Sequence, residues 1–272
     1  NGRFMRLAWF SAGITSTVAC KLALEQFDDV QIYYIETGAH HPDNLRYIAD
    51  CENWFGQKIN IVQNSKGYRD HLDVIEKTGY VNGPTGARCT LELKKEVRRE
   101  TEKVLQPDNQ IFGFEYSKAE INRAIRFKEQ NPHTNPIYPL IEKRLTKDEC
   151  AGLVRMAGIE LPEMYKLGYS NNNCIGCVKG KKGYWNKIRQ DFPEVFSDMA
   201  KAERNAGHAC IKEDLPEGGS KPVFLDELEP EQGRIPTAVI PSCGIFCQVD
   251  FANLIDPKTE KVMSGEMEIC EV

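Results

Sequence analysis

The sequence predicts an α/β fold, an open and mostly parallel sheet with helices on both faces. Short apolar segments rich in β-branched and aromatic residues alternate with segments of helical periodicity, and the connections between them are short. Strands that alternate with helices in this way lie parallel and are covered on both faces. A chain of 272 residues suffices for one such domain with a smaller addition. We expect the α/β domain over residues 5–165 and a cysteine-bearing segment over 166–272.

The predicted elements alternate along the chain. Four segments are apolar and rich in strand-forming residues: 6–10, 30–35, 58–62 and 110–114. Helical periodicity marks 17–27, 42–55 and 90–104. Thr146 and Glu149 have the spacing of a capping box, which predicts a helix to Ala157, and another helix is expected to start at Tyr184. Residues 208–241 are rich in glycine, proline and acidic side chains, so we expect them to be irregular.

Composition narrows the setting of the protein. No apolar run approaches the roughly 20 residues that a bilayer-spanning helix needs, and no signal peptide is evident. A net charge of −5 gives no overall case for nucleic-acid binding, although residues 94–99 and 179–182 are locally basic. Ten cysteines without an export signal indicate a reducing compartment, where cysteines serve as thiols or metal ligands. We therefore expect a cytoplasmic protein with no membrane partner.

A turn of small residues, Ser11-Ala12-Gly13-Ile14-Thr15-Ser16, joins the first predicted strand to the first predicted helix. Small residues let the backbone approach a phosphate, and a helix N-terminus offers free N–H groups and a dipole that favours an anion. The hydroxyls of Thr15 and Ser16 add donors. This pattern is typical of a phosphate-binding loop, although a tight strand–helix turn without a ligand can have it too.

Five segments resemble, in chain order, motifs of the PP-loop superfamily and, within it, of phosphoadenylylsulfate (PAPS) reductases. WFSAGITSTVA is similar to the SGGxDS signature, and YIETGAHHPDNLRYIADCENWFG to the DTG-x-x-FPET stretch. GFEYSKAEINRA resembles G-x-R-x-x-x-S-x-x-R, while YPLIEKRLTKDEC and LPEMYKLGYSNNNCIGC resemble the PL-x-x-W-x-x-x-D-V and LPYNPLYD-x-GY-x-S-x-GC segments. The resemblance implies an adenine nucleotide alpha-hydrolase-like fold that cleaves ATP between its α and β phosphates or binds a sulfonucleotide.

The resemblance also assigns roles to residues. The loop would hold phosphate through Ser11, Gly13, Thr15 and Ser16; the adenosine side would be lined by Glu36, Thr37 and Gly38; and the pocket would be closed by Gly113 and Arg123. A surface ion pair is the alternative role for Arg123. Thr15 replaces the aspartate of SGGxDS, which argues against metal-assisted pyrophosphate cleavage, and Glu36 replaces the aspartate of DTG. We expect His40 and His41 to have loop roles outside the chemistry.

The segment Cys174-Ile175-Gly176-Cys177 is the strongest chemical signal in the sequence. Two thiols three residues apart, with a glycine that permits the turn, can bind one metal ion or one edge of a cluster. The asparagines at 171–173 can direct amide dipoles at the sulfurs. A pair of reduced cysteines without a ligand is the alternative.

Further ligands are expected from two places. Cys89 stands at the start of a predicted helix, whose dipole favours a thiolate. Its segment ARCTLELKK resembles the Cys-Cys-x-x-x-Lys stretch of iron–sulfur adenylylsulfate (APS) reductases, with Thr90 in place of the second cysteine, and the R-C-T-x-x-L-K form of iron–sulfur relatives that act in DNA phosphorothioation. We expect a 4Fe–4S cluster on Cys89, Cys174 and Cys177, completed by Cys243 or Cys247. The alternative is a zinc ion held by the pairs 174/177 and 243/247.

The remaining cysteines differ in what they predict. Cys243 is a candidate nucleophile, because Ser242-Cys243-Gly244-Ile245-Phe246 resembles the E-C-G-L-H motif whose cysteine attacks the sulfonyl sulfur in PAPS reductases. It lacks the acidic residue and the histidine, and no neighbouring cation in the sequence would favour its thiolate. Helix cysteines are expected to be buried as small apolar residues: Cys20, Cys51 and Cys150. Cys210 and Cys270 carry no prediction.

Three functions are compatible with these observations. The first is an ATP-dependent enzyme that adenylates an acceptor, which could be nucleic acid, and transfers sulfur to it with the help of an iron–sulfur cluster. The second is a sulfonucleotide (APS or PAPS) reductase, in which Cys243 forms a thiosulfonate that a dithiol reductant releases as sulfite. The third is a non-catalytic nucleotide- or nucleic-acid-binding module with a structural zinc. The cluster-type cysteines favour the first.

Overall fold

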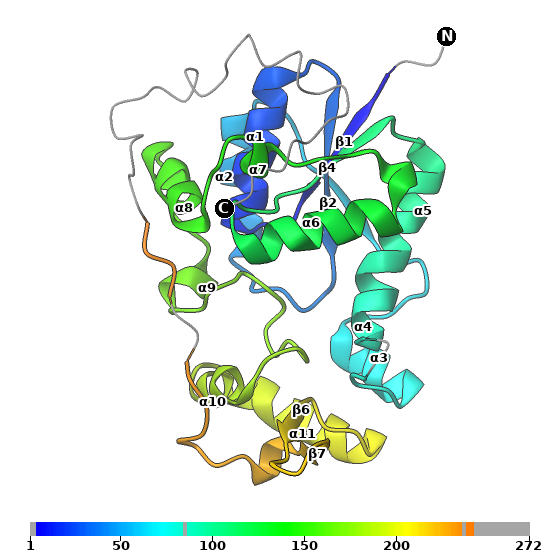
Figure 1. Cartoon of the computed structure of the whole chain (residues 1–272), viewed down its shortest axis with the longest axis vertical. Coiled ribbons are helices and arrows are strands. Elements are labelled where there is room, and N and C mark those ends of the chain that lie inside the picture. Colours follow the sequence, from blue (N-terminus) through cyan, green and yellow to red (C-terminus); the bar gives the residue numbers. More distant parts are fainter. Residues whose placement is uncertain (1–3, 84–85, 236–237, 242–272) are drawn as a thin grey trace.

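The central feature of the structure is a five-stranded parallel sheet with the order β3-β2-β1-β4-β5. The computed structural model describes residues 4–83, 86–235 and 238–241. Ala8 of β1 pairs with Ile32 of β2 on one side and with Ile111 of β4 on the other. The predicted α/β fold is confirmed (Figure 1). The strands are β1 (Arg6–Phe10), β2 (Val30–Glu36), β3 (Asn60–Gln63), β4 (Asn109–Ile111) and β5 (Pro136–Ile137).

The strand order reverses once. The chain builds outward from β1 to β2 and β3, and then returns to place β4 on the free side of β1. Because parallel crossovers are right-handed, the helices before and after this return lie on opposite faces. The connections that leave the carboxyl ends of β1 and β4 therefore diverge, and sheets of this kind bind ligands in the crevice so formed.

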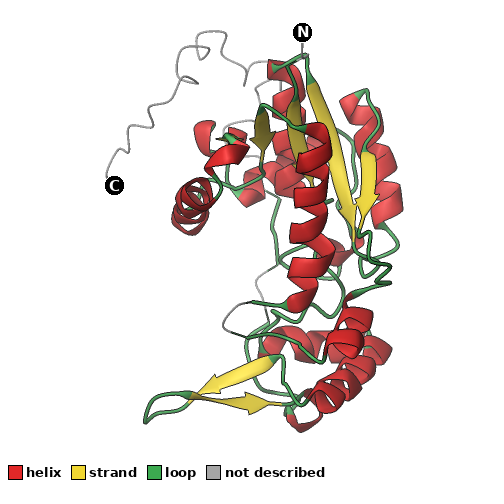
Figure 2. Cartoon of the chain, turned by 90° about the vertical axis from the view of Figure 1, so that its right-hand side faces the viewer, coloured by secondary structure: helices red, strands yellow, loops and turns green. Residues whose placement is uncertain are grey.

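Helices cover both faces of the sheet (Figure 2). Helix α1 packs on α2, α7 and α8, whereas α5 contacts β3. Within the described residues, no helix combines the length and the apolar character that crossing a membrane requires. The helices of this part are α1 (Ile14–Gln26), α2 (Asn44–Phe55), α3 (His71–Thr78), α4 (Arg88–Thr90), the π-helical turn η1 (Leu91–Lys95), α5 (Glu96–Leu105), α6 (Lys118–Gln130), the 3-10 turn η2 (Pro132–Thr134), α7 (Pro139–Glu142) and α8 (Lys147–Met156).

The described residues bury two large apolar cores. The first lies between the sheet and its helices and draws on residues 8–159. The second lies below the sheet in Figure 1 and combines residues 75–87, from α3 and the segment before α4, with residues 164–228. Residues from both sides of the predicted boundary at 165 thus build one core. Its later elements are α9 (Glu163–Lys166), α10 (Lys182–Asp191), α11 (Pro193–Ala206), β6 (Ile211–Asp214), β7 (Ser220–Val223) and the 3-10 turn η3 (Leu225–Glu227).

The expectation that residues 208–241 are irregular was wrong for 211–223. This stretch forms an antiparallel hairpin, in which Ile211 pairs with Val223 and Asp214 with Ser220. Gly218 and Gly219 both have positive φ, +95° and +84°, and they close the turn between the strands. The glycines that suggested irregular structure therefore mark the turn of a hairpin, because glycine adopts this conformation without strain.

Candidate functional site: a pocket at the switch point and a group of cysteines

The loop after β1 is held by its own hydroxyl groups. The Ser16 hydroxyl accepts from the Ser11 N–H at 3.0 Å, donates to the Gly13 carbonyl at 2.9 Å, and lies 2.9 Å from the Ser11 hydroxyl. Ala12 takes the left-handed conformation with φ +56°, and the Asn172 side-chain amide donates to its carbonyl at 2.8 Å. Gly13 has φ −94°, which any residue can adopt. The sharp turn of the loop thus falls on Ala12.

Gly113, just after β4, packs directly against this loop. A Cβ at Gly113 would lie 2.6 Å from the Cα of Ser16 and 2.7 Å from its nitrogen. Backbone atoms cannot give way as a flexible side chain would, so any larger residue would displace the loop. Gly113 therefore packs the carboxyl ends of β1 and β4 together at the switch point, although it does not itself line the cavity described next.

A cavity of about 230 Å³ opens at this switch point. Phe10 ends β1 beside it and Ser11 follows, Ile35 comes from β2, and Phe112 follows β4. The cavity thus has the location at which open parallel sheets bind ligands. The rest of its lining is Trp9, His40, Lys94, Lys95, Arg98, Asn172 and Asn173.

One wall of the cavity is basic. Lys94 and Lys95 end the π-helical turn η1, and Arg98 follows in α5. Turns of this kind are rare and occur frequently at functional sites. Arg98 is ion-paired with Glu102 at 3.0 Å, whereas no ion pair between described residues engages Lys94 or Lys95. Two lysines without a carboxylate partner suit an anionic ligand.

The segment after β2 is fixed by close backbone contacts. The Gly38 N–H donates to Glu36 Oε1 at 2.7 Å, and His40 Nδ1 lies 3.4 Å from the same oxygen. Burial alone would raise the pKa of Glu36, but the hydrogen bonds from His40 and Gly38 outweigh it and lower that pKa to about 2. Gly38 has φ +74°, and a Cβ there would lie 1.8 Å from the Arg69 carbonyl oxygen. Only glycine fits this position.

The same segment touches the first cysteine of the CxxC loop. Thr37 is buried, and its hydroxyl lies 3.2 Å from the Cys174 sulfur. Burial by itself would raise the pKa of the Cys174 thiol, but Lys94, His40 and Thr37 together lower it to about 6. His40, in the loop between β2 and α2, therefore lies beside both the pocket and Cys174. His41 does have a loop role, since its Nδ1 accepts from the Asp43 N–H at 3.1 Å.

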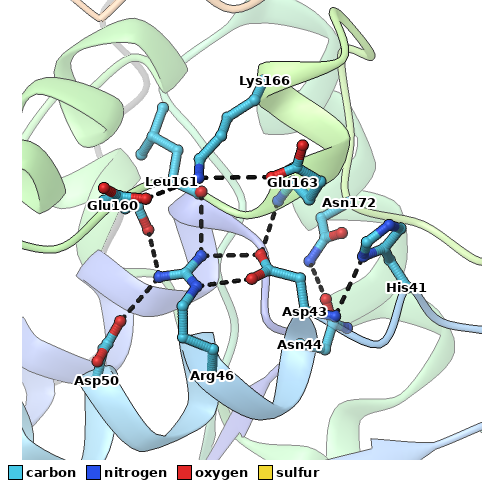
Figure 3. Close-up of polar contacts among 10 residues, drawn as sticks. All are labelled: His41, Asp43, Asn44, Arg46, Asp50, Glu160, Leu161, Glu163, Lys166 and Asn172. Atoms are coloured by element: carbon cyan, nitrogen blue, oxygen red, sulfur yellow. Dashed lines mark hydrogen bonds and ion pairs between the residues drawn. The ribbon is translucent and has the colours of Figure 1, made fainter.

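An arginine in α2 holds the chain that leads to the CxxC loop (Figure 3). Arg46 binds both carboxylate oxygens of Asp43, at 2.6 and 2.8 Å, and donates to the carbonyls of Glu160 and Leu161. Asp43 also accepts from the Glu163 N–H at 2.8 Å. Helix α9 is thus fixed to α2.

Beyond α9, an asparagine ties the CxxC approach to the same helix. The Asn172 amide donates to Asn44 at 2.8 Å (Figure 3). The same amide also donates to the loop carbonyl of Ala12. Asn172 is buried. The amides before the CxxC motif were expected to act on the sulfurs, and this one instead ties the approach to the cysteines to the loop after β1 and to α2.

Three of the predicted metal ligands lie near one another. Cys174 and Cys177 each raise the pKa of the Cys89 thiol, which burial, the largest cause, brings to about 11. Burial also raises the pKa of Cys177, and Cys174 adds to that effect. The loop between Cys174 and Cys177 is turned by Gly176, with φ +73°, and its backbone is held by Tyr184, whose hydroxyl accepts from the Cys177 N–H at 2.9 Å.

These thiols do not form a ready site for a single ion. Within residues 4–83, 86–235 and 238–241, no three His, Cys, Asp or Glu side chains gather closely enough to hold a metal ion. Cys243 and Cys247, the expected further ligands, lie outside the described residues. The helix cysteines Cys20, Cys51 and Cys150 are buried free thiols, as predicted.

The other predicted pocket residues differ in position. Thr15 starts the first turn of α1 beside Gly113, where the signature has its aspartate. Arg123 does not line the cavity: its side chain is 61% exposed, pairs with Glu120 at 3.2 Å, and covers the ring of Phe114. This is the surface ion pair that was its alternative. The sequence reasoning did not assign Lys94, Lys95 or Arg98 to the pocket, although their basic run was visible and Lys94 matches the lysine of Cys-Cys-x-x-x-Lys.

Fold and site define an open parallel α/β protein with a basic pocket at its topological switch point. The model of the family described as phosphoadenosine phosphosulfate reductase domain matches residues 7–181, well over half of the chain. The protein therefore belongs to this PAPS reductase domain family, within the PP-loop superfamily.

Two individual relatives are more distant. An uncharacterized protein of Methanocaldococcus jannaschii is 22% identical over 207 residues, which cover 73% of this chain and 47% of the relative. The chain thus spans about half the length of that curated relative. A crystal structure of phosphoadenylyl-sulfate reductase from Candida auris, in complex with phosphate, is 14% identical with a TM-score of 0.46, and the match covers 62% of this chain and 80% of that one.

Proposed function

We propose that the protein is an enzyme that binds an adenine nucleotide at the switch point and uses it for ATP-dependent sulfur transfer to an acceptor, which could be nucleic acid. One observation carries the proposal: the pocket and the cysteine group share residues. His40 and Lys94 line the pocket and also act on Cys174. A nucleotide held by the loop would thus have its phosphate end close to the thiols.

The loop and the basic wall suit the phosphates. Backbone N–H groups of the first turn of α1, together with the Ser11 hydroxyl, can donate to phosphate oxygens. Lys94 and Lys95 can offset charge that builds up on the leaving group. In the proposed step an acceptor oxygen attacks the α-phosphorus of ATP, the bond to the β-phosphate oxygen breaks, and pyrophosphate leaves. A sulfur nucleophile supplied as hydrosulfide then attacks the activated carbon, and AMP leaves.

The donor chemistry of the cysteine group fits an iron–sulfur cluster. Cys89, Cys174 and Cys177 offer soft thiolate ligands next to an apolar core, and thiolates are the ligands that such clusters use. When bound, a 4Fe–4S cluster supplies an iron atom that can carry the sulfur to be transferred. Zinc is the alternative occupant, and a structural zinc would fit a non-catalytic binding module instead.

A sulfonucleotide reductase is the second candidate, and the family to which the chain belongs favours it. The basic wall would then bind the sulfate of APS or PAPS. A cysteine thiolate would attack the sulfonyl sulfur, the phosphate–sulfate bond would break, and a dithiol reductant would release the sulfonate as sulfite. Cys243 is the nucleophile that the sequence suggests for this reaction.

The pocket is tested with a pair of basic residues from the same helical stretch. Lys94→Met removes a cation from the pocket wall. We expect this variant to bind ATP, APS or PAPS, whichever the parent binds, about tenfold or more weakly. The reason is that a hydrogen bond to a charged group contributes roughly 1.5–3 kcal/mol. Arg99→Met is the matched control, since Arg99 is exposed and paired with Glu96 at 2.5 Å. Equal affinities of both variants and the parent, measured by calorimetry, would reject the pocket.

The reaction is tested by its products. Sulfur transfer predicts release of pyrophosphate and AMP from ATP when acceptor and hydrosulfide are present, and no thiosulfonate on any cysteine after incubation with APS or PAPS. A sulfonate adduct on Cys243, released as sulfite by a dithiol, would replace the first candidate with the second. Metal analysis of anaerobically prepared protein separates the occupants, because zinc without iron after reconstitution excludes the cluster.

A further inference from the structure

One buried asparagine at the pocket has a side-chain oxygen that no described residue satisfies. Asn172 lines the cavity at the switch point, and only 6% of its surface is exposed. Its oxygen, Oδ1, is shielded from solvent and accepts no hydrogen bond from any residue that the structure describes. Buried polar atoms are rarely left in this state, because an unpaired atom loses its hydrogen bonds to water without replacement.

The neighbours of Asn172 fix which end of its amide carries the oxygen. The nitrogen, Nδ2, donates to the backbone carbonyl of Ala12 and to Oδ1 of Asn44, both at 2.8 Å, so both of its hydrogens are used. Figure 3 shows the contact with Asn44. A backbone carbonyl can only accept, so a flipped amide would place oxygen against oxygen at Ala12. The unpaired atom is therefore an acceptor, and what it lacks is a donor.

The contacts on either side hold the asparagine in this position. Asn44 is buried, and its own amide donates to the Tyr34 hydroxyl at 3.2 Å, which lies 2.6 Å from His40 Nδ1. Ala12 has the left-handed φ of +56°, and the bond from Asn172 to its carbonyl helps to hold that turn. Asn172 cannot rotate to satisfy its oxygen without breaking these contacts, so the donor has to come from a ligand of the cavity.

A phosphate group cannot be the partner of this oxygen. The oxygens of an ionised phosphate or sulfate only accept hydrogen bonds, so they repel an amide oxygen. The donors of an adenine nucleotide are the ribose hydroxyls and the amino group of the base. The ribose is bonded directly to the phosphate chain, whereas the amino group lies at the far end of the base. A donor close to the phosphates is therefore a ribose hydroxyl.

Asn172 has the location that a ribose requires. It contacts the phosphate loop at Ala12, between Ser11 and Gly13. It contacts α2 at Asn44, shortly after the segment that the resemblance assigns to the adenosine side. In a nucleotide the ribose connects the phosphates to the base, and Asn172 connects the parts of the protein assigned to those two groups.

We propose that Oδ1 of Asn172 accepts a hydrogen bond from a ribose hydroxyl of the bound nucleotide, so that the pocket selects ribonucleotides over deoxyribonucleotides. This inference rests on the proposed function for the presence of an adenine nucleotide. It makes Asn172 a specificity-determining residue. An amide suits this place better than a charged side chain, because a carboxylate would repel the nearby phosphates and a lysine offers no acceptor.

The test measures the affinities of ATP, 2′-deoxy-ATP and 3′-deoxy-ATP by calorimetry, for the parent and for Asn172→Ala. In the parent we expect one analogue to bind about fivefold more weakly than ATP, the loss typical of one hydrogen bond, and the analogue affected identifies the hydroxyl. In Asn172→Ala that analogue and ATP should bind equally, because the acceptor is gone. A purely structural role of Asn172 would weaken all three nucleotides alike and leave their ratio unchanged.

Asn64→Ala is the matched control. Asn64 also holds a loop, since its amide donates to the Tyr68 carbonyl at 2.8 Å, but its oxygen is paired with the Tyr68 N–H at 2.9 Å. We expect this variant to keep the ratio of the parent. Equal affinities of the parent for ATP and both analogues would overturn the inference, and so would a ratio that persists in folded Asn172→Ala.

A second measurement needs no variant. Fluorine in place of the identified hydroxyl keeps much of its size but cannot donate, so the parent should bind this fluoro analogue of ATP no better than the deoxy analogue. A fluoro analogue that binds as tightly as ATP would contradict the hydrogen bond to Asn172. A parent protein that binds no ATP would refute the proposed function itself, an outcome distinct from equal affinities for ATP and its analogues.

Discussion

The two cores of the molecule are built differently, and the difference explains how the site is assembled. The first core gathers residues 8–159 in chain order around one sheet, with each strand beside a strand or helix near it in sequence. The second core has no central sheet and joins residues 75–87 to residues 164–228. The pocket at the switch point lies at the edge of the first core, whereas Cys89 packs against the second. Nucleotide binding and metal binding should therefore respond differently to damage in each core.

The largest expected effect is on the second core. Trp185 is fully buried there, and it lies beside Gly176 of the CxxC loop, in contact distance of the place where a Cβ would sit. Trp185→Ala should cost about 3–5 kcal/mol of folding free energy, because the cavity cannot close completely. We expect metal retention to fall while nucleotide affinity changes little. Chemical denaturation, metal analysis and calorimetry measure the three quantities.

Leu22→Ala provides the matched change in the first core. Leu22 of α1 is buried, and its truncation to alanine should lower the free energy of unfolding by about 2–5 kcal/mol. Here the opposite pattern is expected, with nucleotide affinity reduced through α1 and metal content retained in the folded fraction. If both variants lose both ligands together, the two cores act as one cooperative unit and the contrast between them fails.

A smaller effect is expected where the pocket depends on close backbone packing. Gly113→Ala places a Cβ 2.6 Å from the Cα of Ser16, so the loop must move. Overpacking of this kind costs about 1–3 kcal/mol, and we expect the affinity for nucleotide to fall with it. Equal nucleotide affinities of the folded Gly113→Ala variant and the parent would show that the loop does not hold the phosphates.

The first core was readable from the sequence because its signals are local. The strand segments and the capping box at Thr146 and Glu149 appear where they were predicted, with shifts of a few residues at the ends. Hydrophobic periodicity reports a face that packs on a nearby element, and the sheet supplies such elements in order. Helix α11 was not predicted, although it packs on its neighbour α10 as well as on the distant α3, and the hairpin was missed because its turn glycines suggested irregular structure.

Only part of the candidate site could be predicted from the sequence, because only some of its residues belong to local motifs. Glycine positions such as Gly38 and Gly113 could be located by resemblance, and the structure gives each a steric cause. The nearness of His40 to Cys174 was not predicted, because the two residues are more than a hundred positions apart in the sequence.

The clamp between α2 and α9 should have a moderate effect. Arg46 holds Asp43 with two parallel hydrogen bonds and also reaches two backbone carbonyls. Arg46→Lys keeps the charge but loses this fork, and we expect a loss of about 1 kcal/mol in stability. Lys58→Met, which removes an exposed pair with Glu52, should change stability by less than about 0.5 kcal/mol. Thermal denaturation at matched protein concentration compares them, and equal shifts would contradict a structural role for the clamp.

The smallest expected effect depends on pH and lies where the two regions meet. Burial would raise the pKa of Glu36, but the hydrogen bonds from His40 and Gly38 lower it to about 2 in the folded protein, against an ordinary value near 4.5. A carboxyl group whose pKa is depressed by folding stabilises the protein above its ordinary pKa, and that contribution is lost as the pH falls from about 4.5 towards about 2. Because the side chain is 32% exposed, solvent screening limits the contribution to about 1 kcal/mol or less.

Glu36→Gln should therefore be less stable than the parent at neutral pH, and the difference in melting temperature between the two should become smaller in acid. The exposed Glu76→Gln, measured alongside, is the control for removing a surface carboxylate. Melting temperatures of Glu36→Gln and the parent that stay equally far apart down to about pH 3 would show that Glu36 is not held ionised by this segment, and that the contact between the pocket and the cysteine loop rests on Thr37 and His40 alone.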